Sequence, residues 1–192
     1  MNPDFDPLAY GRHFGPLLET NRCRELGRGQ RVETMLAPLH DLTVDTAFGD
    51  TKVVDHDMAA GCIAGVWLLY DYLDESHSIS QGIHTTSGSY WHAIMHRREV
   101  DFSNAKYWFH KVGTHPVFEP LAARAASIAE NDPQTDAIDK LATGGPWDPM
   151  AFVDLCERVE QGLPDVGQEC ELIQQAEWEL LFHYCYENAT RG

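Results

Sequence analysis

The sequence predicts a mainly α fold, in which residues 1–192 form a single-domain helical bundle or array around a central apolar helix. Asp-Pro pairs recur along the chain. They are typical of helix starts, because aspartate caps a helix and proline fits its first turn. Apolar residues recur at helical spacing, and the apolar–polar alternation that is typical of strands is almost absent. A chain of 192 residues has the size of one domain.

The first half of the chain is expected to build the centre of this fold. Helices are predicted in residues 9–26 and 31–42. Residues 42–54 are the one plausible strand or hairpin of the sequence, and we interpret them as an irregular connector. Residues 56–73, HDMAAGCIAGVWLLYDYL, are apolar on nearly every face. Because a helix of this kind is usually surrounded by other helices, we predict that it is the central one.

Three short helices are predicted in residues 87–118, SGSYWHAIMHRREVDFSNAKYWFHKVGTHPVF. The first begins at one of two serines and runs to Glu99. The second has Ser103 as its N-cap and ends at Gly113, and the third begins at Pro116. Helix ends therefore cluster in this segment, and their unpaired backbone N–H groups can bind anions.

The C-terminal part is predicted to be helical throughout. A short helix is expected over residues 132–144, and a second one starts at an Asp-Pro pair and spans residues 148–162. Residues 166–189 lack proline and have apolar residues at helical spacing, which predicts a long amphipathic helix.

Charge and composition restrict the partners of this protein. A formal net charge of −16 argues against nucleic acid and against an anionic membrane surface, since both are polyanions. The N-terminus lacks the basic and apolar regions of a secretory signal, and no apolar run is long enough to span a bilayer. The five cysteines are scattered without a C-x-x-C pair. This spacing predicts reduced thiols, and hence a cytoplasmic protein.

Two basic segments, residues 12–31 and 88–115, lie in this acidic chain. A basic pocket in an acidic protein suits a small anion better than a polymer. Arg97 and Arg98 are the candidate ligand-binding residues, because a guanidinium binds carboxylate or phosphate through two parallel hydrogen bonds. In the structural alternative, Arg97 is solvated and Arg98 pairs with a nearby acid such as Glu99.

His92, His96 and Glu99 fall on one face of the first helix in residues 87–118. Two histidines four residues apart, with a carboxylate three residues further on, are a ligand set for zinc, iron or another divalent metal. The same three residues could form a catalytic acid/base pair with an orienting carboxylate. The alternative is a surface feature without function, and the metallopeptidase pattern H-E-x-x-H is absent because Ala93 follows His92.

Aromatic residues gather on the first two of these helices. Trp91, Tyr107 and Trp108 are either core residues or the wall of a ligand pocket. The sequence has no P-loop, no G-x-G-x-x-G loop, no G-x-S-x-G elbow and no C-x-x-C-H haem attachment site.

The block SYWHAIMHRRE…NAKYWFHKVGTHPVF resembles an uncharacterised family of hypothetical proteins, and this resemblance implies no activity. Within it, NAKYWFHKVG is also locally similar to Sel1-type helical repeats, although only one copy occurs. We therefore expect a small-molecule enzyme or ligand-binding protein, with a His/Arg/aromatic pocket around residues 90–115 and an anionic ligand. The alternative is a non-catalytic interaction module whose acidic C-terminal half meets a basic partner.

Overall fold

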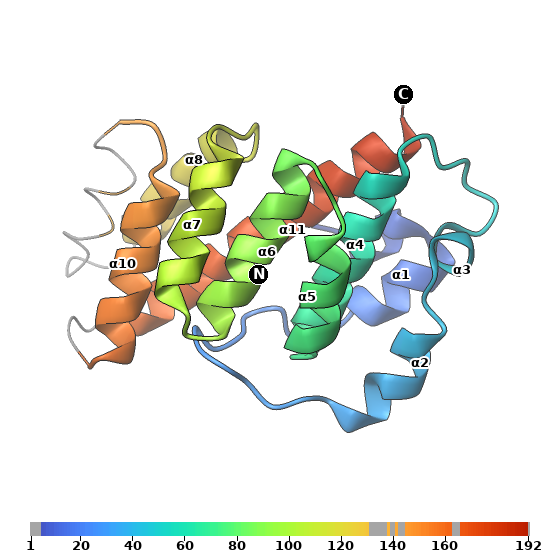
Figure 1. Cartoon of the computed structure of the whole chain (residues 1–192), viewed down its shortest axis with the longest axis horizontal. Helices are drawn as coiled ribbons and strands as arrows, with labels where there is room; N and C mark the ends of the chain where they lie inside the picture. Colours follow the sequence, from blue (N-terminus) through green and yellow to red (C-terminus); the bar gives the residue numbers. More distant parts are fainter. Residues whose placement is uncertain (1–4, 131–137, 139–140, 142–144, 163–165, 192) are drawn as a thin grey trace.

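The computed structural model describes residues 5–130, 138, 141, 145–162 and 166–191 of the chain. The described residues contain helices and no strand, which confirms the mainly α prediction (Figure 1). In chain order the helices are η1 (Pro7–Tyr10), α1 (Gly11–Leu18), η2 (Glu33–Met35), α2 (Leu36–His40), α3 (Val44–Phe48), α4 (His56–Leu69), α5 (Leu73–Gln81), α6 (Thr86–Arg98), α7 (Phe102–Val112), α8 (Phe118–Ala129), α10 (Pro149–Glu160) and α11 (Gly167–Thr190).

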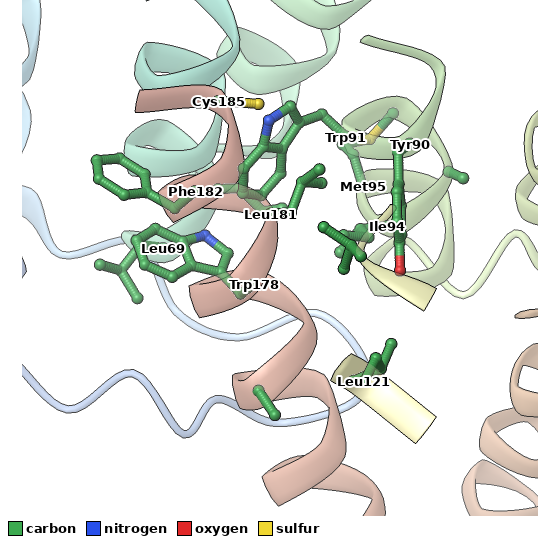
Figure 2. Close-up of a cluster of buried hydrophobic side chains, with 14 of the residues drawn as sticks. Leu69, Tyr90, Trp91, Ile94, Met95, Leu121, Trp178, Leu181, Phe182 and Cys185 are labelled. Atoms are coloured by element: carbon green, nitrogen blue, oxygen red, sulfur yellow. The ribbon is translucent and has the colours of Figure 1, made fainter. Parts of the chain in front are cut away.

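The apolar helix α4 packs against α5, α6 and α11, as predicted for a central helix. Every residue from Gly61 to Leu69 is buried. Gly65 lets α6 approach closely, because a Cβ atom at this position would lie 2.7 Å from Cη2 of Trp91. On α11, Trp178 donates its indole N–H to the carbonyl of Gly65. The core around these two tryptophans joins α4, α6 and α11 (Figure 2).

The apolar segment predicted over residues 56–73 is divided between two helices. Helix α4 begins at Asp55, whose carboxylate accepts the N–H of Met58, and ends at Leu69. Asp71 then adopts a positive φ of 62°, which an α-helix does not allow, and α5 begins two residues later.

The helix ends predicted at Glu99 and Gly113 are confirmed, but the predicted N-caps are wrong. Thr85, rather than one of the two serines, caps α6 by accepting the N–H of Gly88. Asp101, rather than Ser103, caps α7. Threonine and aspartate compete well with serine for the N-cap position, so the type of residue alone does not select the cap.

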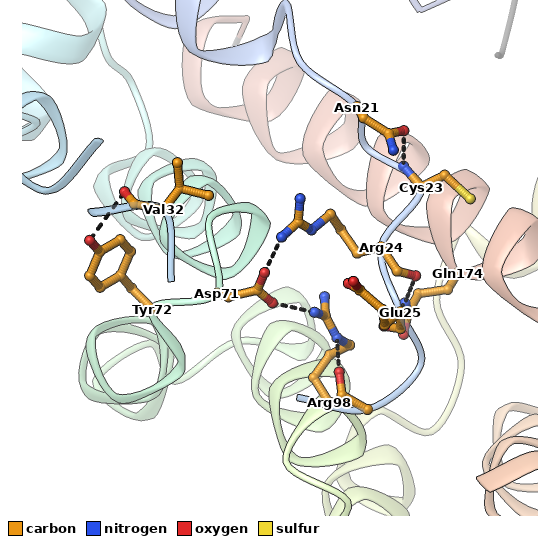
Figure 3. Close-up of polar contacts among 10 residues, drawn as sticks. Asn21, Cys23, Arg24, Glu25, Val32, Asp71, Tyr72, Arg98 and Gln174 are labelled. Atoms are coloured by element: carbon orange, nitrogen blue, oxygen red, sulfur yellow. Dashed lines mark hydrogen bonds and ion pairs between the residues drawn. The ribbon is translucent and has the colours of Figure 1, made fainter. Parts of the chain in front are cut away.

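The prediction of helix over residues 9–26 is only partly right, because α1 ends at Leu18. Residues 19–32, called the strap below, have no helix. Gly29 packs so closely on Asp71 that a Cβ atom there would lie 2.5 Å from its carboxylate. The side chain of Gln174 on α11 donates to two carbonyl oxygens of the strap, those of Arg24 and Glu25 (Figure 3). These tertiary contacts replace the helical hydrogen bonds.

The C-terminal helices agree with the prediction in their bounds. Helix α10 begins at Asp148, which accepts two backbone N–H groups, and Gly162 follows its end with a φ of 75°. Helix α11 has the bounds predicted over residues 166–189, but it is not amphipathic as predicted, because every residue from Ile173 to Glu179 is buried. Apart from residues 138 and 141, the helix predicted over residues 132–144 lies outside the described part of the chain. Among the helices described, none is both long and apolar enough to cross a membrane.

Candidate metal site

Three histidines meet between α5 and α6. His92 and His96 are one helical turn apart on α6, as predicted, and the third member is His77 on α5. One ring nitrogen from each residue lies within 4.8 Å of the other two. The ring centroids are separated by 4.5 Å for His77 and His92, by 4.7 Å for His92 and His96, and by 5.3 Å for His77 and His96.

The separations between the ring nitrogens approach those between the nitrogen ligands of a bound metal ion. Zinc–nitrogen distances of about 2.0–2.1 Å place two tetrahedral nitrogen ligands about 3.3 Å apart. The ring nitrogens lie within 4.8 Å of one another, so the rings have to move closer together to reach that separation. The part of the chain that the structure describes offers no other group of three potential ligands at such separations.

His92 and His96 are buried, whereas His77 is half-buried. Burial, helped by the nearby charges of His96, His77 and Lys111, lowers the pKa of His92 to about 3. Burial also lowers the pKa of His96, although Glu99 opposes this shift. Both imidazoles are therefore neutral near pH 7, which is the state that binds a metal ion.

Neighbouring polar groups orient two of the rings. Nδ1 of His92 lies 3.2 Å from Oγ of Ser80, and Nδ1 of His96 lies 3.2 Å from a carboxylate oxygen of Glu99. Metal-binding histidines commonly use one ring nitrogen for such a contact and the other for the metal. The structure thus places Glu99 beside the three histidines, with its other oxygen 2.7 Å from Nη2 of Arg28.

One face of α7 covers the histidines. Asn104, Trp108 and Lys111 follow the i, i+4, i+7 spacing of a single helix face. The amide nitrogen of Asn104 lies 3.2 Å from Nε2 of His96. The indole of Trp108 lies against His92 with ring centroids 4.0 Å apart, and Nζ of Lys111 lies 4.2 Å from the centroid of the Trp108 ring.

The other predicted pocket aromatics lie elsewhere. Trp91 is fully buried in the core, next to α4 and Trp178. Tyr107 is 55% exposed, and Nζ of Lys111 lies 4.7 Å from the centroid of its ring. Of the three predicted residues, only Trp108 contacts the histidine cluster.

Arg97 and Arg98 are both buried and paired with carboxylates. Arg97 pairs with Glu177 on α11 and lies over the ring of Phe152, with its guanidinium carbon 4.7 Å from the ring centroid. Arg98 pairs with Asp71, which also binds Arg24 of the strap (Figure 3).

These partners differ from the acids that the sequence suggested. Glu177 is 80 residues away from its arginine and Asp71 is 27 residues away, so spacing along one helix gave no signal for them. The sequence pattern did not assign His77, Ser80 or Asn104 to the site, whereas Lys111 lies in the basic segment predicted over residues 88–115. A usable signal was present, because His77 and Ser80 share a helix face, as do Asn104, Trp108 and Lys111.

No family model matches this chain, and neither a curated protein nor a solved structure is significantly similar to it.

Proposed function

We propose that this protein binds a divalent transition-metal ion through His77, His92 and His96. The observation that carries the proposal is the convergence of three ring nitrogens within 4.8 Å, contributed by two packed helices. Imidazole suits zinc, copper, iron and nickel, and it is a poor ligand for magnesium or calcium. Zinc is our first candidate.

Three protein ligands leave one position of a tetrahedral ion open. Structural zinc sites fill all four positions with protein groups, whereas catalytic sites keep one for water or substrate. The arrangement therefore supports the expected small-molecule enzyme or ligand-binding protein, with the ion as the point where the small molecule binds. In an enzyme, the ion would activate a bound water or polarise the substrate.

The test is a metal titration of chelator-treated protein, followed by calorimetry and by elemental analysis after dialysis. We expect one zinc ion per chain for the wild type. His77→Ala should lower the affinity at least tenfold, since it removes one of three ligands. His77 is the most useful position because it is the least buried of the three, so its replacement disturbs the fold least.

His110→Ala is the matched control, because His110 is an exposed histidine on α7 that belongs to no ligand cluster found in the described residues. Far-UV circular dichroism verifies that both variants are folded. Equal affinity of His77→Ala and the wild type would refute the proposal, and so would wild-type protein that takes up no metal.

A further inference from the structure

We infer that the open position of the metal ion binds a small oxyanion of the carboxylate or bicarbonate class, with Asn104 as hydrogen-bond donor and Lys111 as the attracting charge. This inference rests on the proposed metal site. It also relocates the anionic ligand that the sequence suggested, because Arg97 and Arg98 already have carboxylate partners in the interior.

A metal ion held by three histidines needs a counter-charge. Imidazole binds metal ions as a neutral group, so three histidines leave the double positive charge of the ion uncompensated. Two carboxylates lie near the site, and both have other partners. Glu99 contacts the far ring nitrogen of His96 and pairs with Arg28, while Asp101 accepts the backbone N–H of Asn104 at the start of α7. An external anion is therefore the natural fourth ligand.

A hydrogen-bond donor, the side-chain amide of Asn104, lies beside one of the three histidines. The side-chain nitrogen of Asn104 lies 3.2 Å from Nε2 and 3.4 Å from Nδ1 of His96. It therefore lies against the imidazole ring, next to the nitrogen that Glu99 leaves for the metal. When an ion binds that nitrogen, the amide N–H groups stay next to the metal. Metal ligands lie about 3.3 Å from one another. An oxygen atom of a bound anion would thus lie within reach of the amide.

Lys111 lies at the outer side of the site. Its ammonium lies on one face of the Trp108 ring, and His92 lies against the same indole. Among the described residues no carboxylate pairs with Lys111, whereas Lys106 on the same helix pairs with Asp154. Lys111 is exposed, so its charge can attract an anion without a desolvation penalty.

The size of the ligand follows from the surroundings. Two of the three histidines are buried, and α7 covers them with Asn104 and Trp108. The half-buried His77 marks the accessible side. This arrangement favours an anion of a few atoms over a large phosphorylated metabolite.

The test uses the cobalt(II)-substituted full-length chain, because the visible absorption of cobalt(II) reports on each of its ligands. Acetate and bicarbonate are titrated separately at constant ionic strength, with perchlorate as the inert salt. We expect a saturable spectral change with the wild type. Asn104→Leu, which keeps the volume and removes the donor, should weaken anion binding about tenfold.

Lys111→Gln should weaken anion binding a few-fold at low ionic strength, and this difference should shrink in 0.5 M salt because exposed charges are screened. Lys106→Gln is the matched control on α7 and should bind the anion like the wild type. Circular dichroism and the cobalt spectrum without anion verify that each variant is folded and loaded.

The outcomes separate the inference from the proposed function. A cobalt spectrum that no anion changes would overturn the inference and leave the metal site intact. An anion response of equal strength in Asn104→Leu and the wild type would overturn the role of the amide. Protein that develops no cobalt spectrum at all would refute the metal site, and the inference with it.

Discussion

Replacing Arg97 with methionine should destabilise the protein strongly, because it leaves a carboxylate without its counter-charge in the interior. Arg97 and Glu177 are both fully buried. After the substitution, the donor to Glu177 that remains among the described residues is the hydroxyl of Tyr90, at 3.0 Å. Breaking a buried ion pair by removing one partner costs about 3–5 kcal/mol. A typical domain is stable by about 5–15 kcal/mol, so the loss is a large fraction of the total.

Urea unfolding followed by far-UV circular dichroism measures this loss as a shift of the midpoint. The matched control is Lys106→Met, because Lys106 pairs with Asp154 and both side chains are partly exposed. A pair of this kind contributes at most about 1 kcal/mol. Arg97→Met should therefore unfold at a much lower urea concentration than the control, and similar midpoints for the two variants would contradict the argument.

A double variant, in which Glu177 also becomes leucine, tests whether the unpaired charge is the cause. Replacing both members of a buried pair with apolar residues is often nearly neutral. The double variant should therefore be more stable than Arg97→Met alone. If it is less stable, packing around the two side chains, rather than charge, accounts for the loss.

Three more substitutions or conditions probe packing, capping and a buried histidine. Gly65→Ala should lower the free energy of unfolding by about 1–3 kcal/mol, because the new methyl group would lie 2.7 Å from Cη2 of Trp91, and an unchanged urea midpoint would contradict this. Asp148→Ala should cost about 1 kcal/mol in the same assay, since α10 loses the side chain that accepts two backbone N–H groups, and full stability would show that the cap is dispensable. Stability should also fall as the pH is lowered from 6.5 towards 4, because burial lowers the pKa of His115 to about 4 in the folded chain, compared with 6.5 for an ordinary histidine. The unfolded chain binds this proton first, so the stabilisation is complete above pH 6.5 and is lost below it. Urea midpoints measured across this range should fall less steeply for His115→Gln, and identical slopes would refute the assignment.

Local signals predicted the helices well where neighbouring residues alone decide the structure. Asp148 and Gly162 limit α10, and Gly113 ends α7, because a capping side chain or a positive φ acts within a few residues. The strap was mispredicted for the opposite reason. Its sequence permits a helix, but the strap contacts Asp71 through Gly29 and Arg24, α6 through Arg98, and α11 through Arg22, and no local pattern contains these contacts.

The candidate site was predictable in part. The four-residue spacing of His92 and His96 identified the pair, because both lie on one helix. His77 lies fifteen residues before His92 on another helix, and only the packing of α5 on α6 brings it to the pair. Sequence spacing therefore finds ligands that share a helix, and a third ligand from a neighbouring helix requires the fold.

Residues 90–98 of α6 contain several polar side chains, although every residue in this stretch is buried. Buried polar groups need partners, and each of the two arginines pairs with one carboxylate, Arg97 with Glu177 and Arg98 with Asp71. Nε and Nη1 of Arg97 have no hydrogen-bond partner among the described residues. His92 and His96 each use Nδ1 for a polar neighbour, Ser80 and Glu99 respectively, and the three histidines face one another. A metal ion would satisfy all three ring nitrogens at once, which is why the histidines, rather than the arginines, carry the functional proposal.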